Sequence, residues 1–130
     1  MSENQKGAPS NKRRFFASFY YASKGLRCAF VREQNIRIFV IVGILVLLAG
    51  YLLDISKTEW LILLLVISVT FVAEIFNTAI EVLCDKVSLK KDARIGAAKD
   101  IAATAVLTMS LMAAAVGAVI FLPKVIALFS

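Results

Sequence analysis

Three long apolar runs, separated by shorter polar stretches, dominate the pattern of this 130-residue chain. They cover residues 36–53, 59–84 and 99–122. A bilayer core needs about 20 apolar residues in a helix that rises about 1.5 Å per residue. The pattern therefore predicts an all-α integral membrane protein with three transmembrane helices.

The residues before the first run have a different pattern. Residues 1–11 are polar and predict a disordered tail, ahead of a single domain over residues 12–130. Within residues 12–33, basic residues alternate with apolar ones at helical spacing, at Phe15, Phe19, Leu26 and Phe30. This spacing predicts an amphipathic helix on the membrane surface.

Composition agrees with a membrane environment. Hydrophobic residues make up 60% of the chain, and the mean hydropathy is +0.82. A soluble domain of this length exposes too much of its surface to bury that much apolar side chain. Lipid must therefore be part of the solvent.

Basic residues are distributed unevenly around the runs. Most precede the first run or lie in the predicted loop 85–98, and only Lys57 and Lys124 fall on the other side. Positive residues favour the cytoplasmic side, so the N-terminus and this loop are predicted to be cytoplasmic and the C-terminus outside. The net charge of +6 thus indicates topology and attraction to anionic lipid, not nucleic-acid binding.

Two acidic residues interrupt the second run. An ionised carboxylate in hydrocarbon costs about 2.5 to 3.5 kcal/mol even on lenient scales. Counted from Trp60, Glu74 lies roughly 21 Å and Glu81 roughly 31 Å along the helix. Glu81 is therefore expected at the cytoplasmic boundary, with Glu74 deeper in the membrane.

The acids belong to a polar stripe on one face of the helix. At about 100° per residue its members fall within about 80° of one another. They are Glu74, Asn77, Glu81 and Asp85. A polar seam between packed helices is one interpretation; the clustering of acids toward one membrane face favours a functional site instead.

Oxygen ligands at a water interface suit Mg²⁺, and Glu81 is shallow enough to hold one. The deeper Glu74 suits a general base that acts on a hydroxyl presented from the lipid. The chain has no histidine to take that role.

Further charged residues are expected at the same membrane face. Glu33 ends the predicted surface helix, and Lys99 and Asp100 begin the third run. Asp100 suits a helix start, whereas a cation there is disfavoured unless an anion such as a nucleotide phosphate is near. Neither a P-loop nor a G-x-G-x-x-G motif is present, so any nucleotide site is of another kind. The acids and cations indicate metal-assisted transfer to a membrane-resident acceptor, and phosphoryl transfer is favoured because it needs mainly positioning, cations and a base.

Two other classes of protein fit parts of the pattern. In a non-enzymatic membrane assembly subunit, Glu74 and Asn77 would only hold helices together. A proton-coupled transporter subunit is a third possibility. Small residues such as Ala113 and Gly117 in the third run are explained by close helix packing, without chemistry.

Specific stretches of the chain resemble a known family, the small prokaryotic diacylglycerol kinases and undecaprenol kinases. The resemblance covers about residues 14–124. It is carried by the stretches 22–27 (ASKGLR), 73–81 (AEIFNTAIE) with Asp85, and 98–103 (AKDIAA), together with the region of Glu33.

The resemblance implies a homotrimer, with sites shared between subunits, that uses ATP and Mg²⁺ to phosphorylate a membrane lipid alcohol. It implies that Glu74 is the catalytic base, that Glu33 and Glu81 hold the metal, and that Asn77 and Asp85 support the site. Acceptor contacts are expected from Arg14 and Glu74. The implied ATP-binding residues are Arg14, Tyr21, Glu33, Glu81, Lys90, Lys91, Asp92, Lys99 and Asp100, although the loop lacks a histidine that many relatives carry.

The acceptor is the least strongly coded feature. Residues 58–61 (TEWL) and 121–124 (FLPK) look like Gram-positive members of the family, which favours undecaprenol over diacylglycerol. The expected location is the bacterial cell membrane.

Overall fold

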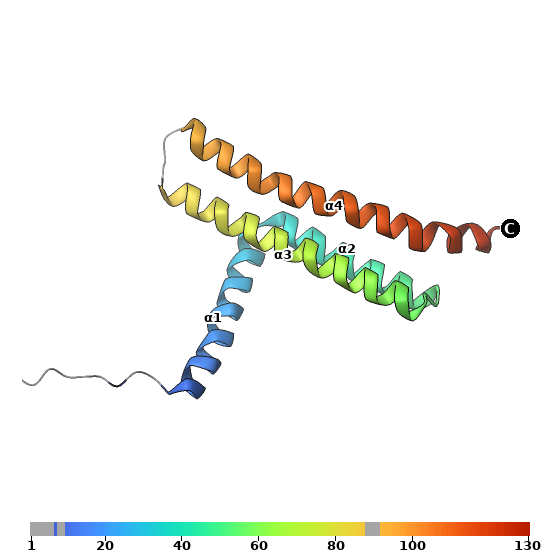
Figure 1. Ribbon diagram of the computed structural model, residues 1–130, viewed down its shortest axis with the longest axis horizontal. Helices are drawn as coiled ribbons and strands as arrows, with labels where there is room; N and C mark the ends of the chain where they lie inside the picture. Colours follow the sequence, from blue (N-terminus) through green and yellow to red (C-terminus); the bar gives the residue numbers. More distant parts are fainter. Residues whose placement is uncertain (1–6, 8–9, 88–91) are drawn as a thin grey trace, which may run out of the picture.

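The computed structural model describes residues 7, 10–87 and 92–130, and that part of the chain is helical without strands (Figure 1). Most of the predicted tail, and Lys90 and Lys91, lie outside the described residues. The helices are α1 (Asn11–Arg32), α2 (Gln34–Leu52), α3 (Lys57–Val87) and α4 (Ala93–Leu128).

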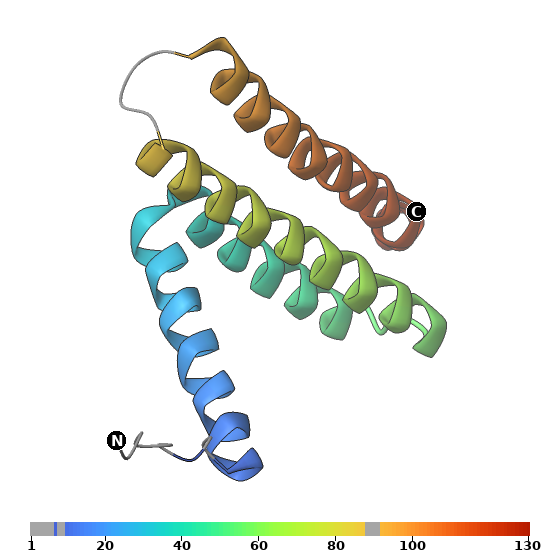
Figure 2. The ribbon, with the colours of Figure 1, turned by 60° about the vertical axis from the view of Figure 1, so that its left-hand side comes forward.

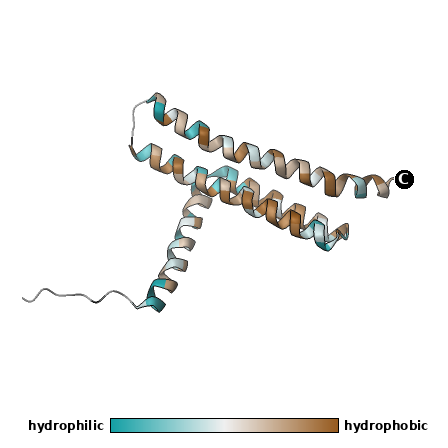
Figure 3. Ribbon diagram, viewed as in Figure 1, coloured by the Kyte–Doolittle hydropathy of each residue, from teal (hydrophilic) through white to brown (hydrophobic). Residues whose placement is uncertain are grey.

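The apolar runs form the helices that the pattern predicts. Helices α2, α3 and α4 are each long and apolar enough to cross a membrane. Figure 3 shows apolar residues along most of their length and hydrophilic residues mainly toward their ends. Large apolar side chains face outward, as at Leu65 and Val119, which are 64% and 76% exposed. Such a surface needs lipid or protein to cover it, so the prediction of an all-α membrane protein is confirmed.

Helix α1 is separated from α2 by a single residue. Glu33 adopts an extended backbone conformation (φ −112°, ψ 119°), which interrupts the helical hydrogen bonding at this point. Figures 1 and 2 both show α1 leaving the other helices at a steep angle, with its N-terminal end farthest from them. Glu33 therefore lies at the corner where the chain changes direction.

A tight turn joins α2 to α3. Asp54 adopts a left-handed conformation (φ 49°), and the Ile55 amide donates to the Gly50 carbonyl at 3.2 Å. A Cβ on Gly50 would lie 3.1 Å from the Trp60 ring, so glycine permits the close approach of the indole. The hairpin predicted between the first two spans is thus present.

Helices α3 and α4 run antiparallel and are longer than the predicted spans. The segment 85–98, predicted as a loop, is helical at both ends: α3 continues to Val87, and α4 begins at Ala93. A helix need not end at the membrane boundary, and the Asp92 carboxylate caps α4 by accepting from the Arg94 amide at 2.8 Å. Helix α4 also continues through Pro123 to Leu128, so the proline does not end it.

An ion pair joins α3 and α4 at the end opposite their connection. Lys124 Nζ lies 3.3 Å from Glu59 Oε2. The Glu59 carboxylate also accepts from the Ser56 amide at 2.8 Å, and the Ser56 hydroxyl accepts from the Glu59 amide at 3.2 Å, which forms a capping box. Glu59 thus supports both the start of α3 and its packing on α4.

Removing this carboxylate should lower stability more than removing its partner. We expect Glu59→Ala to lower the unfolding temperature in detergent by several degrees, because cap and ion pair are lost together. Lys124→Met should have a smaller effect, since a partly exposed ion pair contributes little. Equal shifts for the two variants would contradict the capping role.

Candidate active site

The polar stripe of α3 begins at a buried glutamate. The Glu74 residue is only 8% exposed. The neighbouring hydroxyls of Thr70 and Thr78 are also buried, but each donates to a carbonyl of its own helix, of Val66 at 2.8 Å and of Glu74 itself at 3.0 Å. Among the described residues no group donates a hydrogen bond to the Glu74 carboxyl, which argues against a satisfied polar seam.

One helical turn further along, Asn77 has an unused acceptor. Its Nδ2 donates to Glu81 Oε1 at 3.4 Å. Its Oδ1 is buried and has no hydrogen-bond partner among the described residues. A buried oxygen without a partner is costly unless something else binds it.

Glu33 lies against the stripe from the corner between α1 and α2. Burial, and then the negative charge of Glu81, raise the pKa of the Glu33 carboxyl. The carboxyl groups of Glu33, between α1 and α2, and of Glu81, on α3, are therefore close enough to repel each other. No group of three or more acidic, histidine or cysteine side chains that could hold a metal occurs in residues 10–87 and 92–130.

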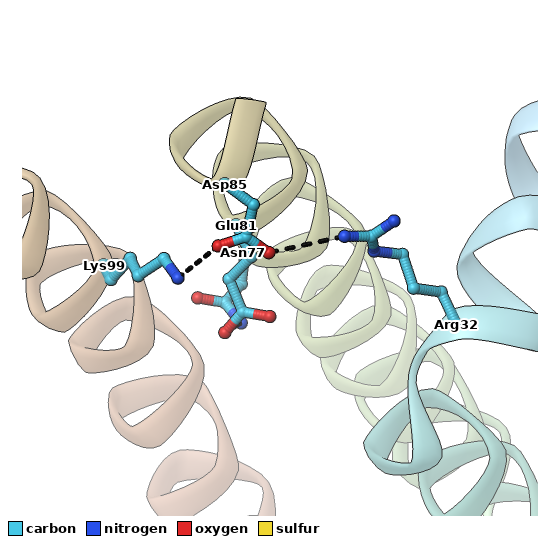
Figure 4. A network of polar contacts seen from close by, with 5 residues as sticks. All are labelled: Arg32, Asn77, Glu81, Asp85 and Lys99. Carbon is cyan, nitrogen blue, oxygen red and sulfur yellow. Dashed lines mark hydrogen bonds and ion pairs between the residues drawn. The ribbon is translucent and has the colours of Figure 1, made fainter. Parts of the chain in front are cut away.

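At the end of the stripe, Asp85 joins three helices (Figure 4). One carboxylate oxygen lies 3.3 Å from Arg32 Nη2 of α1, and the other lies 2.5 Å from Lys99 Nζ of α4. The role of Arg32 could not be predicted from the sequence, because its position in the last turn of α1 does not indicate that Asp85 is its partner. Lys99 lies inside α4 and not at its start. The anion beside its ammonium group in this chain is the Asp85 carboxylate.

The remaining predicted residues are not brought to the stripe. Arg14 and Tyr21 are exposed and belong to α1, a helix that projects away from the other helices (Figure 2). Asp92 caps α4. Asp100 lies exposed within α4, past its first turn, so the helix-start interpretation of this residue is wrong.

A mainly apolar groove of about 460 Å³ lies between α2, α3 and α4, and Glu74 is part of its wall. Its size is within the range of small-molecule pockets, about 300 to 1,000 Å³. The wall contributed by α4 includes Ser110, Ala113, Ala114 and Gly117. Within this chain Ala113 and Gly117 line an open groove, so their interpretation as helix-packing positions stays a prediction about contacts with another copy.

The fold and the site define a small helical membrane protein with a carboxylate stripe near one end of its spans. A sequence profile described as "Prokaryotic diacylglycerol kinase" matches residues 20–121. The chain belongs to this family and is a lipid kinase, an enzyme class with ATP as co-substrate.

Named relatives agree with this assignment. Undecaprenol kinase of Bacillus subtilis is 38% identical over 111 residues, which are 85% of this chain and 90% of the relative. Diacylglycerol kinase of Synechocystis is 35% identical over 85% of this chain and 64% of the relative. Diacylglycerol kinase of Escherichia coli K12 is 29% identical over 72% of this chain and 76% of the relative.

Proposed function

We propose that the protein phosphorylates undecaprenol, with Glu74 as the general base; diacylglycerol is the alternative acceptor. The observation that carries the proposal is a mostly buried glutamate in the wall of a mainly apolar groove, whose carboxyl group makes no hydrogen bond among the described residues. A lipid alcohol matches such a site, because its chain suits the groove and its hydroxyl suits the carboxylate.

The proposed reaction is a direct transfer. The acceptor hydroxyl gives its proton to the Glu74 carboxylate as its oxygen bonds to the γ-phosphorus of ATP. The bond from that phosphorus to the bridging oxygen breaks, and ADP leaves. Phosphoryl transfer depends mainly on positioning and on stabilisation of charge, so one base and a few cations suffice.

Mg²⁺ is proposed to bind at Glu33 and Glu81, with Asn77 Oδ1 as a further candidate ligand. These donors fit a hard cation, since all are oxygens and Asn77 Oδ1 has no partner among the described residues. When bound, the ion would neutralise phosphate charge. It would also relieve the repulsion between Glu33 and Glu81. Two carboxylates would fill only part of the coordination sphere of Mg²⁺. The remaining positions would be open to phosphate oxygens and water.

Nucleotide binding is proposed for the charged residues around this cluster. Lys99 is the best placed, because it lies at the end of the stripe and could exchange Asp85 for a phosphate. Asp100, Asp92, Lys90 and Lys91 remain proposals from the family resemblance. We add Arg32, which shares Asp85 with Lys99.

A homotrimer with shared sites is proposed for the assembly. Arg14 and Tyr21 belong to α1, which projects away from the helix that carries the stripe (Figure 1). In an assembly, the projecting α1 could bring them to a neighbouring subunit's ATP or acceptor. The exposed aromatic side chains of α1, such as Phe15 and Phe19, suit an amphipathic helix at the membrane surface.

The proposed location is the bacterial cell membrane, with the N-terminus and the active site cytoplasmic and the C-terminus outside. The positive residues before the first span and around the α3–α4 connection support this orientation. It also gives the site access to cytoplasmic ATP.

The proposal is tested by a phosphorylation assay in detergent micelles that offers undecaprenol and diacylglycerol in parallel with labelled ATP. We expect that label enters either lipid only when Mg²⁺ is present. We also expect more label in undecaprenol than in diacylglycerol. Preference for diacylglycerol would select the alternative acceptor. Absence of label in either lipid would refute the proposal.

The ion pairs of Asp85 give a separate prediction. We expect Asp85→Asn to raise the KM for ATP several-fold with a smaller change in kcat, because Arg32 and Lys99 lose their shared anion and their positions. Asp54→Asn, which removes an exposed acid in the α2–α3 turn, is the matched control. Unchanged ATP kinetics in Asp85→Asn would show that the network does not position the site.

A further inference from the structure

Two ion pairs show which residues of α3 and α4 lie at the same level. Lys99 meets Asp85 near the stripe, and Lys124 meets Glu59 at the opposite end. The two pairs are separated by nearly the same number of residues on each helix, so positions between them correspond closely. Ser110 of α4 thus lies level with Glu74, and Gly117 lies level with Ile67.

A second glycine occupies the same level on α2. A Cβ on Gly43 would lie 3.9 Å from Ile67 Cγ2, which places Gly43 beside Ile67 as well. Gly43 and Gly117 both line the groove. A Cβ on Gly117 would meet no atom within 4 Å, so a larger side chain there would enter open space without a clash.

The distance from this level to the carboxyl group follows from helix geometry. Ile67 precedes Glu74 by two helical turns, or about 10 Å along α3. A hydrocarbon chain whose hydroxyl reaches Glu74 and which follows the groove away from the stripe must therefore pass the two glycines.

We propose that Gly43 and Gly117 form a passage for the acceptor's hydrocarbon chain and determine which acceptors the enzyme uses. This inference rests on the proposed function and assigns specificity-determining residues to it. The chain is a better occupant than a helix from a second copy, because an apolar helix about 10 Å wide would cover the Glu74 carboxyl without giving it a partner.

The test is a chain-length series of prenols, from geraniol through farnesol to undecaprenol, with wild type, Gly117→Leu and Ala118→Leu. Ala118 is the adjacent residue on α4, is exposed and is absent from the groove wall. Gly117→Leu should lower kcat/KM for undecaprenol at least about tenfold, mainly through KM, since the added side chain occupies the passage. Geraniol, which reaches the glycines but does not extend past them, should lose much less activity than undecaprenol, and Ala118→Leu should resemble wild type.

Three outcomes would overturn the inference. The first is that kcat/KM depends on prenol chain length in the same way in Gly117→Leu and in wild type. The second is an equal loss for geraniol and undecaprenol in Gly117→Leu. The third is a loss of the assembled state, measured by light scattering, in Gly117→Leu, which would make this groove an interface between copies. Gly43→Leu provides the second variant, with the same expected profile. If wild type phosphorylated no prenol, the proposed function itself would fail, and this result is distinct from the other three.

Discussion

Glu74→Gln is expected to reduce lipid-dependent ATP turnover by about 100- to 10,000-fold, the usual contribution of a general base. The amide preserves size and hydrogen-bonding capacity but cannot accept the hydroxyl proton. The measurement is kcat in micelles with saturating ATP, Mg²⁺ and acceptor. Because Glu74 has no hydrogen-bond partner among the described residues, the variant should fold and assemble normally.

The control for this prediction is Glu59→Gln, the same substitution at the other end of α3, which should keep near-normal turnover. Full turnover in Glu74→Gln would exclude the residue as the base. A loss of assembly in Glu74→Gln with unchanged activity per folded protein would instead identify a structural polar contact between helices.

Glu81→Gln should lower activity at least about tenfold at fixed Mg²⁺, with partial recovery at high Mg²⁺, because one charged oxygen ligand is lost. Titration of turnover against Mg²⁺ measures the effect. An unchanged Mg²⁺ dependence would contradict the proposed metal site.

Glu33→Gln separates metal binding from stability in the same cluster. The raised pKa of the Glu33 carboxyl means that burial and Glu81 disfavour its charged form. Neutralising it should therefore raise the unfolding temperature near neutral pH in the presence of a chelator, while Mg²⁺-dependent turnover falls. A lower unfolding temperature would show that the two carboxylates do not repel each other in the absence of metal.

The elements of the fold could be predicted because their signals are local. An apolar run of sufficient length predicts a membrane helix wherever it occurs. The 3.6-residue helical period places Glu74, Asn77 and Glu81 on one face, whatever helices pack beside them. The predicted ends of the second and third membrane helices were wrong. The apolar pattern predicts a loop over residues 85–98 because it indicates only the length that crosses a membrane, whereas α3 and α4 extend beyond their apolar runs.

Contacts between helices could not be predicted from the same signals. Nothing in the sequence near Arg32 indicates Asp85, and nothing near Lys124 indicates Glu59. Likewise, a stripe of small residues such as Ala113 and Gly117 is equally consistent with a packed helix and with an open groove. The outcome depends on how far apart the neighbouring helices lie at that level.

The sequence by itself determined the membrane spans, the buried position of a carboxyl group in the second of them and the polar stripe that leads from it, because these depend on properties within one helix. The tertiary structure decided that Glu33 lies against Glu81, that Asp85 joins α1, α3 and α4, and that Glu74 lies in the wall of a groove. These features depend on the register and spacing of different helices, which the apolar pattern of each helix leaves undetermined.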